Sequence, residues 1–171
     1  LAMIPLMSVT RNFFMGREPT KGRGILKRFD AETANEICME EMRKMGINLR
    51  GPDQAVGTLS GGERQTVAIA RAVHFGAKVL ILDEPTAVLT PKECDQLFEL
   101  VKLLKEQGKT VLFVTHKLHE IMATADDVTV IRAGKVVARR KTAETSSEEL
   151  AELMVGAKVV REVARDKHAD A

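Results

Sequence analysis

Residues 79–85 read Val-Leu-Ile-Leu-Asp-Glu-Pro, so four apolar residues lead directly into two adjacent carboxylates. A short, continuous apolar run is typical of a strand that is buried on both faces of a parallel sheet. Ligands of such sheets bind outside the carboxyl ends of the strands, where Asp83 and Glu84 would lie. Two acids there suit a hydrated Mg²⁺ on a phosphate, with one acid holding the ion and the other polarising a water. The simpler alternative is a strand that ends in an ordinary polar turn.

A second apolar run, Val-Leu-Phe-Val at residues 111–114, is followed by Thr115 and His116. The segment between the two runs begins with Thr90-Pro91-Lys92-Glu93, a capping box with proline at the first helical position. Strand, helix and strand predict a βαβ unit and therefore an α/β architecture with a parallel sheet core. His116 would then lie at the same sheet edge as the two acids, where it could donate to a phosphate oxygen. A lone histidine of this kind is more often structural.

A small-residue turn, Ser60-Gly61-Gly62-Glu63, precedes a predicted helix that Gly76 closes. Small residues let the backbone approach a ligand, and a hydroxyl and free N–H groups at a helix start favour an anion. The alternative is a serine N-cap after a flexible loop.

The rest of the chain has weaker signals. Glycine and proline among basic residues predict a loop over residues 8–30. Helical spacing, turn residues and caps predict a helix at 31–45 ending at Gly46, a short helix at 117–124, a hairpin of 128–131 with 135–138, and a helix from 146 to Gly156.

The composition excludes several classes of protein. The 26 basic and 24 acidic residues leave a net charge of +2, too balanced to indicate a nucleic-acid binder. The absence of Trp and Tyr argues against a platform that stacks bases. No apolar run approaches the ~18–20 residues of a membrane span. The two distant cysteines, Cys38 and Cys94, fit free thiols in a reducing compartment.

Taken together, and in their order along the chain, the motifs at 60–63, 79–84 and 111–116 resemble the ATP-binding-cassette (ABC) ATPases. The resemblance covers nearly all of residues 1–156. The turn at 60–63 lies where the family has its signature motif, residues 79–84 look like its Walker B strand, and 132–135 resemble its late hairpin. The resemblance implies that the cofactors are ATP and Mg²⁺. It implies nucleotide contacts at Ser60, Gly61, Gly62 and Glu63, metal binding at Asp83, and catalytic roles for Glu84, as the base, and His116, as the switch histidine.

Two residues depart from the family pattern. Glu63 replaces the usual glutamine of the signature. The D-loop, residues 86–90, ends in Thr90 where aspartate is common. The capping box explains Thr90 structurally, and the exchange would weaken signalling between two ATP sites.

No GxxxxGK[ST] motif occurs in the chain. By resemblance, we expect a P-loop NTPase-like ABC ATPase fold with a helical subdomain that is incomplete at its N-terminus. The chain would act as an ATPase within the complete protein, and this segment alone would be inactive. The expected division is 1–76, helical subdomain and signature region; 77–156, Walker B and H-loop part of the catalytic core; and 157–171, a charged tail.

Residues 4–19 resemble importers of simple sugars. The stretch from 86–91 to 115–120 resembles the sugar and nucleoside importers whose ATPase chain holds two tandem cassettes. The resemblance implies the energy-coupling ATPase of a bacterial importer, cytoplasmic and peripheral on the inner face of the membrane. Its partners would be a second ATPase domain (homodimer or tandem), membrane permease subunits and, indirectly, a periplasmic solute-binding protein, with no nucleic acid. Alternatives are a family member that acts on the ribosome or DNA, and a non-catalytic binding piece. The absence of a sustained heptad and the near-neutral charge disfavour the former.

The family docks a permease helix between the Q-loop and the signature motif. By resemblance, this face would include Phe13, Phe14 and Met15 as exposed apolar residues. The alternative is that these side chains pack against the helix at 31–45.

Overall fold

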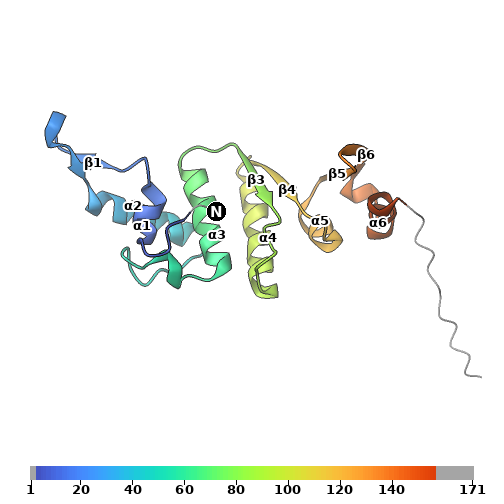
Figure 1. Ribbon diagram of the computed structural model, residues 1–171, viewed down its shortest axis with the longest axis horizontal. Coiled ribbons are helices and arrows are strands. Elements are labelled where there is room, and N and C mark those ends of the chain that lie inside the picture. The colour runs from blue at the N-terminus through green and yellow to red at the C-terminus, as the bar shows by residue number, and fades with distance from the viewer. Residues whose placement is uncertain (1–2, 157–171) are drawn as a thin grey trace, which may run out of the picture. The chain divides into compact units, whose positions relative to one another are not determined.

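A computed structural model of the chain describes residues 3–156, which divide into two compact units, the first ending at Val114 and the second beginning at Thr115 (Figure 1). The first unit contains α1 (Val9–Phe14), β1 (Thr20–Lys21), η1 (Gly24–Leu26), β2 (Arg28–Phe29), α2 (Ala31–Lys44), η2 (Val56–Thr58), α3 (Gly61–His74), β3 (Val79–Asp83), α4 (Pro91–Glu106) and β4 (Thr110–Val114). The second contains α5 (Leu118–Thr124), β5 (Asp127–Arg132), β6 (Lys135–Lys141), η3 (Thr142–Glu144) and α6 (Ser147–Val155). The expected boundary between residues 76 and 77 stays a prediction.

The helices α1, α2 and α3 surround an apolar core in the first unit. Side chains from each helix are fully buried there, including Phe13, Met42 and Val67. The helix predicted at 31–45 is confirmed as α2, and Gly46 follows it with φ of 75°. The loop predicted over residues 8–30 is wrong, because Ser8 accepts a hydrogen bond from the Arg11 N–H at 3.3 Å and caps α1.

The end of α1 carries a cluster of rings that contradicts the predicted exposed docking surface. Phe13 and Phe14 are both buried, and Phe14 packs 5.8 Å from the His74 ring and 6.0 Å from the Phe75 ring, centroid to centroid. Burying the apolar area of these rings inside the unit stabilises the fold, whereas leaving it exposed to water would not. The docking role is therefore wrong for these two side chains, whereas for the half-buried Met15 it stays a prediction.

The strands β3 and β4 pair in parallel, with Val79 opposite Thr110 and Asp83 opposite Val114. Residues of α4 pack on one face of this pair, so the predicted βαβ unit and the α/β class are confirmed (Figure 1). The prediction that both strands are buried on both faces is wrong for the described residues, since alternate side chains remain exposed on the other face. These are Val79 at 58%, Ile81 at 67%, Leu112 at 53% and Val114 at 43%.

The second unit is built on the antiparallel hairpin of β5 and β6. Its two central residues, Ala133 and Gly134, both have positive φ, as a type I′ turn requires. Leu150 of α6 is fully buried against this hairpin. The predicted hairpin and both predicted helices are confirmed, with Gly156 ending α6 at φ of 84°. The predicted tail, 157–171, lies outside the described residues.

Within residues 3–156, none of the helices is long and apolar enough to cross a membrane.

Candidate functional site

The backbone turns sharply where β3 ends. Asp83 is the last residue of the strand and is exposed, and Glu84 follows it with φ of 45°. The Glu84 N–H donates to the Val114 carbonyl at 2.8 Å, which holds the turn against the end of β4. A left-handed conformation costs a non-glycine residue about 1–2 kcal/mol, and such strain concentrates at functional sites. Among the described residues, Glu84 shares a positive φ at a non-glycine position only with Ala133 of the hairpin turn.

The Ser60 turn is a capping box at the start of α3. The Ser60 hydroxyl accepts the Glu63 N–H at 3.2 Å, and the Glu63 carboxylate accepts the Ser60 N–H at 2.7 Å. The simpler prediction, a serine N-cap, is thereby confirmed. The Glu63 carboxylate serves this cap, and its predicted contact with a nucleotide stays a prediction.

The two glycines of this turn lie against the loop that follows Glu84 and against the start of α4. A Cβ on Gly61 would lie 3.3 Å from the Val88 carbonyl oxygen, and a Cβ on Gly62 would lie 3.0 Å from Glu93 Cγ. Both distances are shorter than the contacts that a Cβ atom ordinarily makes, so any larger residue would push its neighbours aside. The small residues of the motif are therefore explained in part by packing within the chain itself.

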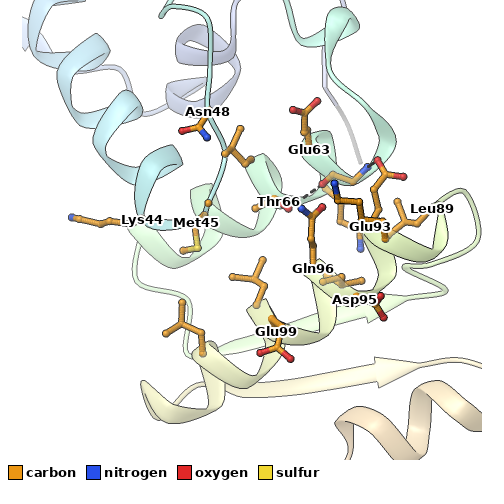
Figure 2. Close-up of a pocket in the computed structure, with 18 residues that line it drawn as sticks. Lys44, Met45, Asn48, Glu63, Thr66, Leu89, Glu93, Asp95, Gln96 and Glu99 are labelled. Atoms are coloured by element: carbon orange, nitrogen blue, oxygen red, sulfur yellow. Dashed lines mark hydrogen bonds between the residues drawn. The ribbon is translucent and has the colours of Figure 1, made fainter.

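Glu93 joins the starts of α3 and α4 (Figure 2). Its carboxylate accepts the Gly62 N–H at 3.1 Å and, at the start of its own helix, the Thr90 N–H at 2.9 Å and the Thr90 hydroxyl at 2.8 Å. Hydrogen bonds to the carboxylate lower the pKa of Glu93 from 4.5 to about 2. The Ser60 hydroxyl has the largest effect, and the Thr90 and Gly62 donors come next. The capping box predicted the contact with Thr90, whereas nothing in the sequence predicted the bond to α3.

A hollow of about 620 Å³ opens beside this junction, between α3, α4 and the residues that follow α2 (Figure 2). Four acidic and two basic side chains line it, namely Glu63, Glu93, Asp95, Glu99, Lys44 and Lys92. Asp83 and Glu84 are not among its lining residues. The hollow therefore adjoins the signature turn and does not contain the predicted catalytic acid.

His116 lies two residues beyond β4, in the second unit. Its neighbours in the chain are held by hydrogen bonds: the Thr115 hydroxyl accepts the Lys117 N–H at 3.1 Å and donates to the Glu120 carboxylate at 2.7 Å. The predicted meeting of His116 with Asp83 and Glu84 at one site stays a prediction.

The donors at the end of β3 fit a magnesium ion bound together with a phosphate. Mg²⁺ keeps several waters and takes one or two carboxylates along with phosphate oxygens. The exposed Asp83 supplies one such carboxylate at the carboxyl end of a parallel strand. In the part of the chain that the structure describes, no cluster of three or more acidic, histidine or cysteine side chains could hold a metal by itself. This donor set is consistent with a Mg²⁺ ion that binds only together with the phosphates of a nucleotide.

The fold is that of the P-loop NTPases, as found in ATP-binding cassettes. One similar structure is the dimeric cassette MJ0796 in a post-hydrolysis state bound to ADP and Pi, with a TM-score of 0.63 and 27% identity over 82% of this chain and 59% of that chain. Another is the ADP conformation of the cassette MJ1267, with a TM-score of 0.68 and 25% identity over 91% of this chain and 62% of that one.

The ABC transporter family matches residues 2–87, and the chain belongs to that family. It is 41% identical to a ribose import ATP-binding protein of Rubrobacter xylanophilus over 92% of this chain and 31% of the relative. It is 40% identical to a nucleoside import ATP-binding protein of Lactococcus lactis over 92% of this chain and 30% of that relative. The chain thus spans about a third of the length of the curated relatives that it matches.

Proposed function

We propose that this chain is part of the ATP-hydrolysing subunit of a bacterial importer for a sugar or nucleoside. The observation that carries the proposal is the similarity to ribose and nucleoside import ATP-binding proteins across nearly the whole chain. The strained Glu84 at the end of a parallel strand supports it, because a strained acid at a ligand-binding edge is typical of catalysis. The names of these relatives favour an importer over a family member that acts on the ribosome or DNA.

The proposed site residues act on two different nucleotides, one bound by this cassette and one bound by a second cassette. Glu84 orients a water against the terminal phosphate and takes its proton, and His116 donates a hydrogen bond to a phosphate oxygen. Asp83 holds Mg²⁺, which neutralises charge on the phosphates when it is bound. Ser60, Gly61, Gly62 and Glu63 serve the nucleotide of a second cassette, which packs head to tail against this one.

The proposed assembly places the chain on the cytoplasmic face of the membrane. Two cassettes, in a homodimer or in one tandem chain, close on ATP and move the permease subunits that contact them. A periplasmic solute-binding protein delivers the solute from the other side. The relatives' names, which describe import, support this arrangement.

The test uses a chimera in which this chain replaces the segment that it matches in the Rubrobacter relative. We expect the chimera to hydrolyse ATP with the relative's permease in membrane vesicles. Glu84→Gln should lower turnover by at least about a hundredfold, because an amide cannot accept the proton. Glu99→Gln, an exposed acid of α4, is the matched control and should leave turnover unchanged. A folded chimera without ATPase activity, or with equal rates in both variants, would refute the proposal.

A further inference from the structure

Glu120 is a carboxylate that the proposed mechanism leaves without a role. It lies on α5, and only 1% of its side chain is exposed. Burying a carboxylate costs several kcal/mol unless charge and hydrogen bonds compensate it. An acid in such a position therefore has specific partners, and their identity indicates what it does.

Two of the partners of the Glu120 carboxylate are the residues on either side of His116. The Thr115 hydroxyl donates to Glu120 Oε2 at 2.7 Å, and the Lys117 ammonium lies 3.3 Å from Glu120 Oε1. The Thr115 hydroxyl also accepts the Lys117 N–H at 3.1 Å, which links the two neighbours to each other. The Glu120 N–H donates to the Lys117 carbonyl at 3.1 Å, in the first turn of α5. His116 therefore stands in a short loop whose two flanks are fixed to one buried group.

A simple helix start would not need this arrangement. A hydroxyl or short acid at the N-cap satisfies the first N–H groups at the surface, without burying a charge. Here the N-cap residue, Lys117, makes no capping bond with its side chain and pairs with Glu120 instead. What the pair adds is a fixed backbone at residue 116, because a half-buried Lys117 is held by a buried Glu120, and ion pairs with a buried member can serve to specify one conformation.

We propose that Glu120 is a positioning residue that holds His116 for phosphate contact by tying down both of its neighbours. The inference rests on the role proposed above for His116. Glu120 does not touch the nucleotide in this scheme. It acts through the orientation of the imidazole, and small misplacements of a reacting group lower turnover far more than they lower binding.

The first test is kinetic and uses the chimera. Glu120→Gln keeps the size of the side chain but removes the charge that pairs with Lys117. We expect kcat to fall at least about tenfold with KM for ATP unchanged. Glu149→Gln is the matched control, because Glu149 also accepts a threonine hydroxyl, Thr145, and pairs with a cation, Arg140, both at 2.7 Å. This control should retain the kcat of the parent, and an unchanged kcat in Glu120→Gln would overturn the proposal.

A double-mutant cycle separates positioning from general stability. In a His116→Ala background, Glu120→Gln should lower kcat no further, because the group that it positions is gone. An equal loss in both backgrounds would show a structural role and overturn the proposal. If Glu120→Gln does not fold, Thr115→Val removes only the hydroxyl that joins the two flanks, and the same cycle applies to it.

A second measurement keeps the inference separate from the proposed function. ¹³C relaxation of the His116 ring in the 171-residue chain, assigned by its loss in His116→Ala, reports how firmly the ring is held. Glu120→Gln should make the ring more mobile and Glu149→Gln should not, and an unchanged ring overturns the proposal. If His116→Ala leaves the turnover of the chimera unchanged, the proposed role of His116 fails, and ring relaxation alone then decides whether Glu120 holds it.

Discussion

The carboxylate of Glu93, in the first turn of α4, accepts a hydrogen bond from the backbone N–H of Gly62, in the first turn of α3. This single bond spans 31 residues of sequence and joins the signature turn to the end of the D-loop segment. A helix start presents unpaired N–H groups and a partial positive charge, so a carboxylate is favoured there. Glu93 thus satisfies donors of two helices with one side chain.

The stability supplied by Glu93 should depend on pH. Its pKa in the folded chain, about 2, lies below the ordinary 4.5, so its contribution is complete above pH 4.5 and is lost as the pH falls toward 2. Wild type should therefore be more stable than Glu93→Gln at neutral pH, and the difference should shrink across this window. Urea unfolding at several pH values measures it. Glu106→Gln, at the end of the same helix, controls for the loss of one charge, and a difference that does not change with pH would contradict the prediction.

Gly62→Ala should be destabilising only while Glu93 is present. The new Cβ would lie 3.0 Å from both Cγ and Oε1 of Glu93, so it would separate the two helix starts. In a Glu93→Gly background, which also removes the Glu93 Cβ that would lie 3.1 Å from the new Cβ, the same exchange should be neutral or stabilising, because alanine favours a helix over glycine by about 1 kcal/mol. The two unfolding free energies should therefore reveal a coupling of about 1 kcal/mol. Gly51→Ala, where a Cβ meets nothing within 4 Å, is the control, and additive effects would argue against the contact.

Glu84→Gly should be more stable than Glu84→Ala by about 1 kcal/mol, because only glycine adopts φ of 45° without strain. The opposite order is expected at Glu99, in the interior of α4, where alanine is the better helix former. Chemical unfolding of the four variants tests the pair of signs. If alanine is the more stable residue at both positions, the turn after β3 is not strained in solution.

Local features could be predicted from a few consecutive residues. The capping box of Thr90 and Glu93 and the helix that it begins are examples, since their hydrogen bonds close over three residues. The bond from Glu93 to Gly62 and the positive φ of Glu84 depend on how distant segments pack, so the sequence did not reveal them. The loop prediction failed at the short helix α1 because glycine, proline and basic residues follow it closely and hide its cap at Ser8. For the proposed site, the residue types and their order along the chain could be predicted from the sequence. The backbone strain at Glu84 could not.

The exposed face of β3 and β4 should make the chain associate with itself. Apolar side chains there lie on strands that, among the described residues, each pair with one neighbour only, and such faces and edges are prone to association. Sedimentation velocity should show a rate that rises with concentration, and Ile81→Thr with Leu112→Thr should reduce that rise. Ile25→Thr with Leu26→Thr, two more exposed apolar positions that lie in η1 and not on a strand, should not. A wild-type monomer at every concentration would contradict the prediction.

Phe14→Glu should unfold the first unit and should not act as a surface change. The ring is buried against Phe13 at 5.0 Å, His74 and Phe75, so the exchange removes a packed aromatic side chain and places a charge among apolar rings. The loss in unfolding free energy should exceed about 3 kcal/mol. Leu6→Glu is the control, because Leu6 is 94% exposed and its exchange should change stability by no more than about 0.5 kcal/mol. Thermal unfolding followed by circular dichroism compares the two, and a Phe14→Glu variant that melts like wild type would return Phe14 to the surface as a docking residue.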